Sequence, residues 1–366
     1  MKRIIFILYF ACCATFLFVS CEGPMGALGI DGVDGEDGDV TCLSCHADEK
    51  MQSVQFQFGM SSHCIGAVDA ERDGWDAGCV QCHTSEGFID YATNGMPEAG
   101  LSTPSGPFEC KTCHGLHSTF DSTDYALRLT EPVAFIYSED FTTPVTADFG
   151  TSNLCANCHQ SRRPEPNFEV PGTTFYISST HYGPHHGSHV NVLAGVGFAE
   201  IAGTASYPTA GSAVHMTQAN CASCHMSDFS VNVNAEGDDE GQGGHSFRPN
   251  LDACNSCHGV AETDFDHGDF QTETEAQLLE LRDLLVAQGV VEQAMEDIWE
   301  INQTTGINEL VTYAGDYHPV KGTFTMVQAQ AFYNWVGLEE DRSLGAHNPL
   351  YVKALLTNSI AALGGK

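Results

Sequence analysis

The sequence predicts loops and short helices over residues 41–270, followed by an α-helical region over residues 271–366. Three observations lead to this prediction. Residues 41–270 are rich in Gly, Ser, Thr and Asn and show little sustained hydrophobic period of either the helical or the strand kind. The same stretch carries six copies of one short Cys- and His-containing motif. From residue 272 onward, apolar side chains recur at helical spacing.

Residues 1–20 form a signal segment, in which Lys2 and Arg3 precede an apolar run. The sequence Phe18-Val19-Ser20-Cys21 resembles a bacterial lipobox, although Phe18 stands where Leu is usual, and the resemblance implies that Cys21 carries lipid. Within residues 21–40, Gly recurs at every third place from residue 23 to residue 38, but the segment is short and has one proline, Pro24. We interpret it as a flexible tether rather than a collagen-like helix. We therefore expect an exported outer-membrane lipoprotein that faces the periplasm or the cell surface.

The motif is Cys-x-x-Cys-His, and it predicts six covalent c-type haem groups, each with one iron. Two thiols three residues apart can reach the two vinyl groups on one edge of a porphyrin, and the adjacent His can then bind the iron. A zinc site or a thioredoxin-like redox motif would not require His after every pair. The predicted attachment cysteines are Cys42, Cys45, Cys79, Cys82, Cys110, Cys113, Cys155, Cys158, Cys221, Cys224, Cys254 and Cys257. The predicted proximal iron ligands are His46, His83, His114, His159, His225 and His258.

The haem density also bears on the fold. Six haems in about 346 mature residues would let apolar porphyrin plates supply much of the core of residues 41–270. We therefore expect loops and short helices around stacked haems.

Eleven further histidines could supply the second axial ligand of each iron: His63, His117, His181, His185, His186, His189, His215, His245, His267, His318 and His347. This surplus favours bis-His over Met-His ligation, which closes the irons to substrates and lowers their reduction potentials. For isolated loop histidines such as His189, His267 and His318, a surface or propionate-binding role is the favoured interpretation.

Several segments resemble bacterial multihaem c-type cytochromes. Ser61-Ser62-His63 precedes a Cys-x-x-Cys-His-x-x-Glu-Gly-Phe block that ends at Phe88, and Ser343-Leu-Gly-Ala-His347-Asn-Pro resembles the closing ligand motif of large multihaem reductases. Similar ligand motifs surround residues 117, 181–187, 215 and 245. The resemblance implies the distal ligands His63, His117, His186, His215, His245 and His347. His185 is a close alternative to His186, and His181 is the next.

Three functions fit these features. The favoured one is an electron carrier for envelope or extracellular respiration, with all six irons closed by two His ligands. A second is a reductase of the nitrite or hydroxylamine type, which needs one open iron; the Cys-x-x-Cys-Lys motif that often marks such an iron does not occur here. The third is a cytochrome that polymerises into extracellular filaments.

The charge of the chain restricts its partners. The formal net charge of −34 excludes nucleic acid and an anionic membrane surface as direct electrostatic partners, since both would be repelled. We expect other redox proteins or extracellular electron acceptors as partners, and membrane attachment through the lipid at Cys21.

The C-terminal region predicts three helices. Thr272 to Glu275 form a capping-box pattern ahead of apolar residues at helical spacing, and Gly289 is a plausible stop. A second helix is predicted over residues 326–340. A third is predicted after Asn348, with Pro349 at its first position, and it should end near Gly364.

Overall fold

The computed structural model describes residues 46, 48–65, 77–95, 106–118, 124–166, 173–259, 263–301 and 308–365. The predicted signal segment, Cys21, the tether, Cys42 and Cys45 lie outside these residues.

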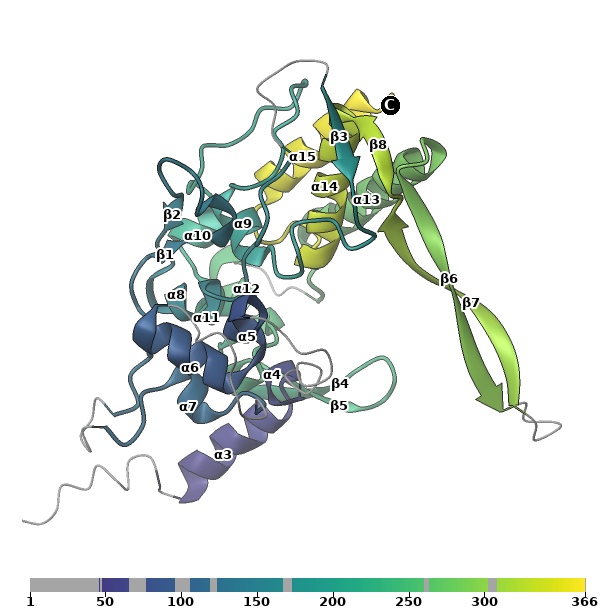
Figure 1. Cartoon of the computed structure of the whole chain (residues 1–366). Helices are drawn as coiled ribbons and strands as arrows, with labels where there is room; N and C mark the ends of the chain where they lie inside the picture. Colours follow the sequence, from purple (N-terminus) through teal and green to yellow (C-terminus); the bar gives the residue numbers. More distant parts are fainter. Residues whose placement is uncertain are drawn as a thin grey trace, which may run out of the picture.

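Short helices and loops dominate the described residues up to 259 (Figure 1). In chain order the elements there are α3 (Asp48–Gly59), α4 (Ser62–Ile65), α5 (Ala77–His83), α6 (Ser85–Asn94), α7 (Cys110–Cys113), β1 (Val133–Ala134), the 3-10 helix η2 (Ile136–Ser138), β2 (Thr146–Ala147), η3 (Gly150–Ser152), α8 (Asn153–Ala156), β3 (Thr174–Ile177), α9 (His189–Ala194), α10 (Val214–Thr217), α11 (Cys221–His225), β4 (Ser230–Val233), β5 (Asp239–Gln242), η4 (Gly244–Ser246) and α12 (Leu251–His258).

Longer elements follow. They are η5 (His267–Asp269), α13 (Phe270–Ala287), β6 (Val291–Ile301), β7 (Asn308–Pro319), β8 (Gly322–Thr325), α14 (Met326–Asp341) and α15 (Pro349–Ala362). The strands of the described residues pair antiparallel as β1–β2, β3–β8, β4–β5 and β6–β7. Within the described part of the chain, no helix has both the length and the apolar character needed to cross a bilayer.

The three predicted C-terminal helices are confirmed, with small shifts at their ends. The helix α14 ends one residue beyond the predicted boundary, and its N-cap Thr325 forms a capping box with Gln328. The N-cap of α15 is Asn348, whose side chain accepts the backbone N–H of Tyr351, and Pro349 occupies the first turn. These caps provide acceptors for backbone N–H groups that a helix cannot satisfy internally.

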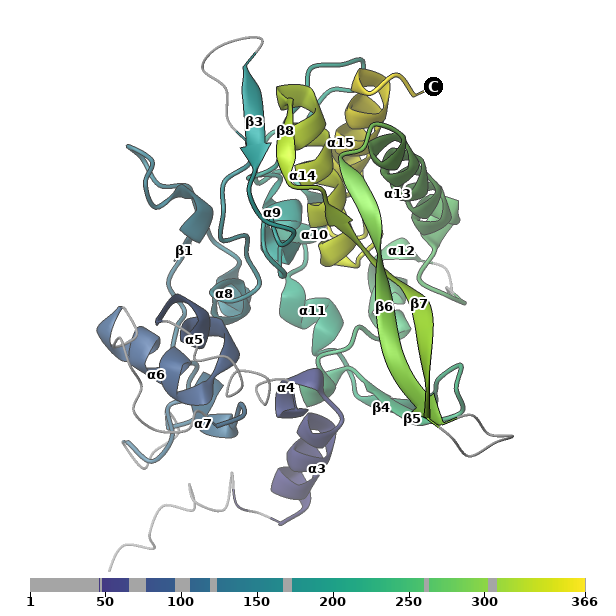
Figure 2. The same cartoon turned by 45° about the vertical axis from the view of Figure 1, so that its right-hand side comes forward.

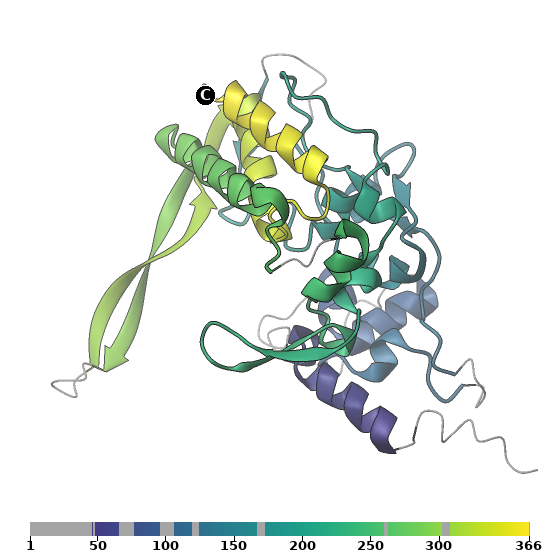
Figure 3. The same ribbon diagram turned by 180° about the vertical axis from the view of Figure 1, so that it is seen from behind.

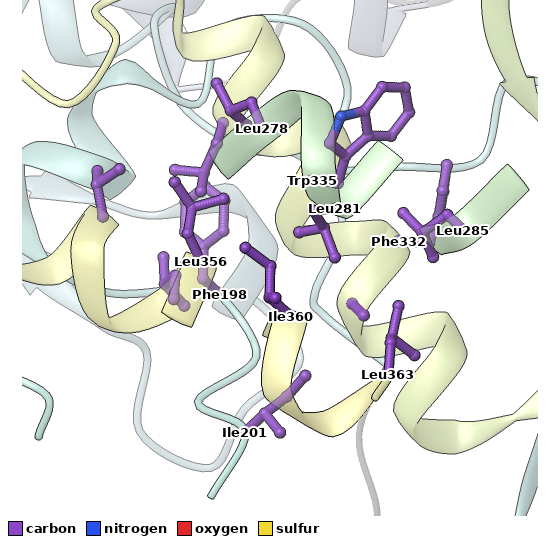
Figure 4. Packing of buried hydrophobic residues seen from close by; sticks show 14 of the residues in the cluster. Phe198, Ile201, Leu278, Leu281, Leu285, Phe332, Trp335, Leu356, Ile360 and Leu363 are labelled. Atoms are coloured by element: carbon purple, nitrogen blue, oxygen red, sulfur yellow. The ribbon is translucent and has the colours of Figure 1, made fainter. Parts of the chain in front are cut away.

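The main hydrophobic core lies among α13, α14 and α15, which run side by side in Figures 2 and 3. Leu281 of α13, Phe332 of α14 and Leu355 of α15 are fully buried in it. Ile177 of β3 and Val192 of α9 join the same cluster, so the core holds the middle of the chain against its C-terminal end. Figure 4 shows this interlocking packing around Leu281, Phe332 and Ile360.

Buried apolar residues are scarce around most of the Cys-x-x-Cys-His motifs. A second cluster, which includes Phe135 and Val190, packs against Ala156 of α8. Among the described residues of 46–118, the buried apolar side chains are Val80 and Phe88, and the described residues of 221–259 contribute none. Protein side chains therefore supply little of the interior in these segments.

The strands β6 and β7 form a long two-stranded ribbon that projects from the body of the molecule (Figures 1 and 3). The sequence analysis did not predict this ribbon, and it interrupts the region expected to be helical. Met295, Ile301 and Leu310 on the ribbon are more than half exposed. The ribbon joins the core at its base, where Val291 is buried beside α13 and Tyr317 packs against the same cluster.

Candidate haem-binding sites

The described attachment motifs lie on short helices, except that the fourth leaves α8 after Ala156 and continues in a turn. One helical turn brings residues i and i+3 to the same face, so the two cysteines of each motif project together. Polar residues at the helix starts help to form these turns: Asn220 accepts the backbone N–H of Ser223 ahead of α11, and Asn250 accepts that of Asp252 ahead of α12. We number the sites 1 to 6 in the order of their motifs along the chain.

The second motif is supported by α6, which follows it directly. Thr84 caps α6 by accepting the backbone N–H of Gly87 at 3.0 Å. A side chain at position 87 would place its Cβ only 2.3 Å from the carbonyl oxygen of Val80 in α5. The glycine of the Glu-Gly-Phe segment therefore allows α6 to pack closely on the motif helix.

Each proximal histidine has a second imidazole opposite it. The ring-centroid separations are 6.0 Å for His46–His117 (site 1), 6.2 Å for His83–His185 (site 2), 6.4 Å for His114–His245 (site 3), 5.9 Å for His159–His63 (site 4), 6.4 Å for His225–His347 (site 5) and 6.2 Å for His258–His215 (site 6). Residues far apart in the sequence thus form six pairs of nearly equal spacing.

This spacing fits an iron between the two rings. A metal–imidazole bond is about 2.0–2.1 Å long, the value for zinc, and a ring nitrogen lies about 1.1 Å from the ring centroid, so imidazoles on opposite sides of one metal have centroids about 6.3 Å apart. The angles between ring planes vary from 14° at site 1 to 79° at site 4. Such variation is compatible with axial ligation, because each ring can turn about its own metal–nitrogen bond.

Hydrogen bonds orient several of these rings. The Nδ1 atom of His114 lies 2.6 Å from the carbonyl oxygen of Tyr125, and that of His225 lies 2.8 Å from the carbonyl oxygen of Phe247. A carbonyl oxygen only accepts, so Nδ1 donates and the lone pair is left on Nε2. The rings are therefore prepared to bind a metal through Nε2.

The protonation state also suits metal binding. Burial lowers the pKa of His63, His159 and His245. Burial, assisted by the charge of Arg162, lowers the pKa of His185 to about 4. These imidazoles are neutral at neutral pH, and the neutral form is the one that coordinates metals.

Five of the six predicted distal histidines face a proximal histidine, but His186 does not. Its Nδ1 atom forms an ion pair with Glu340 at 2.6 Å, and its side chain is 75 % exposed. His185 instead faces His83. A positive φ of 72° at His185 turns the backbone sharply between the two neighbours. We therefore replace His186 by His185 in the ligand set proposed below.

Three other histidines lie near the pairs. His189 is 4.9 Å from His159, and His267 is 4.1 Å from His258; both separations are too short for ligands on opposite sides of one iron. His181 lies 6.2 Å from His318, but no Cys-x-x-Cys-His motif includes either residue. His189 also lies 5.9 Å from His347, so its surface or propionate-binding role stays a prediction, as it does for His267 and His318.

A cavity of about 270 Å³ lies between sites 2 and 4. Its lining includes both imidazoles of each site and one cysteine of each motif, namely His83, His185, Cys82, His159, His63 and Cys158. The two predicted haem positions therefore open into one shared space.

Sites 2 and 4 touch directly, because the Gln81 side-chain amide donates to the carbonyl oxygen of Asn157 at 3.4 Å, between the cysteines of both motifs. Site 3 joins site 2 through the buried hydroxyl pair Ser85 and Thr112, 2.7 Å apart. Site 1 shares a short segment with site 3, since His117 lies three residues after His114.

Sites 5 and 6 extend the series from site 4. The backbone N–H of Ala222 in the fifth motif donates to the Ser152 hydroxyl, ahead of the fourth motif, at 3.0 Å. The backbone N–H of Asn250, which caps the helix of site 6, donates to the carbonyl oxygen of Cys224 at 3.3 Å. These contacts and the shared segment link the sites in the series 1–3–2–4–5–6. Sites 3 and 5 also meet at Phe247, whose ring lies 5.7 Å from that of His245 and whose carbonyl oxygen accepts from His225.

Comparison with known proteins finds likeness among solved structures but not among family models or curated proteins. The solved structure described as "Crystal Structure of Outer Cell Wall Cytochrome OcwA" is similar, with a TM-score of 0.48 and 15 % identity over 84 % of this chain. The match covers 49 % of that chain, so this protein spans about half the length of the structure it resembles.

Proposed function

We propose that this protein is an electron carrier with six covalently attached c-type haems, each closed by two histidines. Bound haem supplies one-electron chemistry by cycling between ferric and ferrous iron. The observation that carries the proposal is the set of six imidazole pairs at 5.9–6.4 Å, each with one member from a Cys-x-x-Cys-His motif. The chain's part is to attach the porphyrins, to bind both faces of each iron and to hold neighbouring sites in contact.

The proposed ligand set changes in one position from the sequence expectation. The proximal ligands are those of the motifs, and the distal ligands are His117, His185, His245, His63, His347 and His215 for sites 1 to 6. The attachment cysteines are the twelve of the six motifs, of which Cys42 and Cys45 lie outside the described residues. Sites that contact one another, such as 2 and 4 or 3 and 5, are the proposed partners for direct electron exchange.

The pairing favours a carrier over a reductase. A reductase needs an iron with a free coordination position, whereas every proximal histidine of this chain has an imidazole opposite it. The polymerising alternative has one supporting feature, the projecting β6–β7 ribbon with its exposed apolar residues. Partners of the carrier would be redox proteins or extracellular acceptors that tolerate its strong negative charge.

The intact mass and the spin state of the purified protein test this function. We expect a mass that exceeds the apoprotein by six haem units and an electron paramagnetic resonance spectrum of the oxidised protein with low-spin signals only. A smaller haem count would contradict the attachment assignment. A persistent high-spin fraction near one haem in six, together with turnover of nitrite or hydroxylamine, would replace the carrier by the reductase.

We further propose that the carrier is held at the outer membrane through lipid on Cys21. A single acyl chain binds membranes weakly, whereas several chains on one residue hold firmly. Changing Cys21 to Ser is expected to move haem-loaded protein from the membrane fraction to the soluble fraction after cell lysis. A variant that still sediments with membranes would show that a partner or an uncleaved segment anchors it. Proteolysis of intact cells would distinguish a surface-exposed protein from a periplasmic one.

A further inference from the structure

A buried carboxylate lies directly behind one of the axial histidines. Asp341 is the last residue of α14, and its side chain is 1 % exposed. It accepts a hydrogen bond from Nδ1 of His347 at 2.7 Å and a second one from the hydroxyl of Ser343. With Nδ1 donating to Asp341, Nε2 of His347 carries the lone pair, and its ring lies 6.4 Å from that of His225 at site 5.

The group that accepts the Nδ1–H hydrogen bond of His347 differs from the corresponding groups of other axial histidines. The Nδ1 atoms of His114, His215 and His225 face neutral backbone carbonyl groups, at 2.6, 2.5 and 2.8 Å. Behind His347 the acceptor carries a full negative charge. A carboxylate in this position makes the imidazole a stronger donor to its metal and fixes its orientation.

The surroundings leave that charge directed at His347. In the described part of the chain, the basic side chain that pairs with Asp341 is His347, and no Lys or Arg forms a salt bridge with this carboxylate. The other nearby polar groups are the Ser343 hydroxyl and the imidazole of His189. Because the carboxylate is out of contact with water, solvent screens its effect on site 5 weakly.

We propose that Asp341 is a positioning residue that lowers the reduction potential of the haem at site 5. The inference rests on the proposed function, since it requires a haem iron between His225 and His347. Negative charge on the distal ligand stabilises ferric over ferrous iron, and hydrogen bonding around axial ligands is one of the means by which proteins set haem potentials. Site 5 would thus be harder to reduce than the same site with a carbonyl behind His347.

The test is a spectroelectrochemical titration of holoprotein carrying Asp341→Asn. Asparagine keeps the size and a hydrogen-bond acceptor but removes the charge. One haem of six is expected to shift to higher potential by at least a tenfold change in its ferric–ferrous equilibrium, which is about 59 mV for one electron. The low-spin resonance signal of the same haem should change its g values, while the other five stay unchanged.

Two further variants make the result specific. Asp283→Asn removes an exposed carboxylate of α13 that pairs with Arg282, and it should leave all six potentials unchanged. Ser343→Ala removes the hydroxyl that also donates a hydrogen bond to the carboxylate of Asp341. Because the carboxylate charge then acts more fully on His347, the reduction potential of site 5 should fall rather than rise. The Ser343 variant also supplies an answer if Asp341→Asn does not fold.

The outcomes separate the inference from the function on which it rests. Unchanged potentials in both the Asp341 and Ser343 variants, in a protein that has six low-spin haems, would overturn the inference and leave the carrier intact. A wild-type protein with fewer haems or with a high-spin iron would contradict the proposed function itself.

Discussion

Replacing His347 by alanine is expected to open one iron of the six without loss of haem. The porphyrin of site 5 would stay attached through Cys221 and Cys224, and His225 would still bind its proximal face. Removal of the imidazole opposite His225 leaves that iron five-coordinate. About one sixth of the haem should therefore become high-spin in electron paramagnetic resonance and visible spectra.

The same substitution should destabilise the C-terminal helices. It leaves the carboxylate of Asp341 buried without the Nδ1–H donor of His347, and losing a hydrogen bond to a buried charged group costs about 1.5–3 kcal/mol of unfolding free energy. Thermal unfolding of the holoprotein measures the loss. His318→Ala is the matched control, because His318 lies opposite no proximal histidine, and it should keep all six irons low-spin. If the His347 variant stays wholly low-spin with unchanged potentials, the ligand must be sought elsewhere, with His189 the nearest imidazole.

Alanine variants of the adjacent residues His185 and His186 are expected to differ strongly in the spin state of one iron. His185→Ala should open the iron of site 2 and produce a high-spin signal, because His185 faces His83 at 6.2 Å. His186→Ala should leave six low-spin irons, because that side chain is mostly exposed and pairs with Glu340. Spectra of the two variants under identical conditions decide between them.

The opposite result would favour His186, the ligand of site 2 that the sequence resemblance implied. High-spin iron in the His186 variant, with a wild-type spectrum for the His185 variant, would mean that the backbone turn at His185 has the other orientation. A high-spin signal in neither variant would exclude both residues as ligands of site 2.

The sequence predicted local features better than long-range pairs. The motif cysteines and proximal histidines follow from spacing alone, and the helices near residues 326 and 349 follow from caps and periodicity. The partner of each proximal histidine does not, since His114 and His245, for example, come from elements that only the fold brings together. The choice between His185 and His186 depends on one backbone angle, and sequence does not show it.

Two further differences have physical causes. The helix α13 begins at Phe270, two residues before the predicted capping box, because the carboxylate of Asp266 accepts the backbone N–H of Gln271 and the hydroxyl of Thr272. The β6–β7 ribbon was missed because much of it is exposed, so no buried face imposes a clear alternation of apolar and polar residues.

The placement of the main core determines when the protein can fold. The core that receives Ile177 and Val192 is built mostly from α13, α14 and α15, the last elements of the chain to be synthesised or exported. On the proposed export route, the cysteines of all six motifs would cross the membrane before this scaffold exists, and haem would be attached to an open chain. His347, between the last two helices, would be the final proposed axial ligand to arrive, so closure of site 5 would mark the end of maturation.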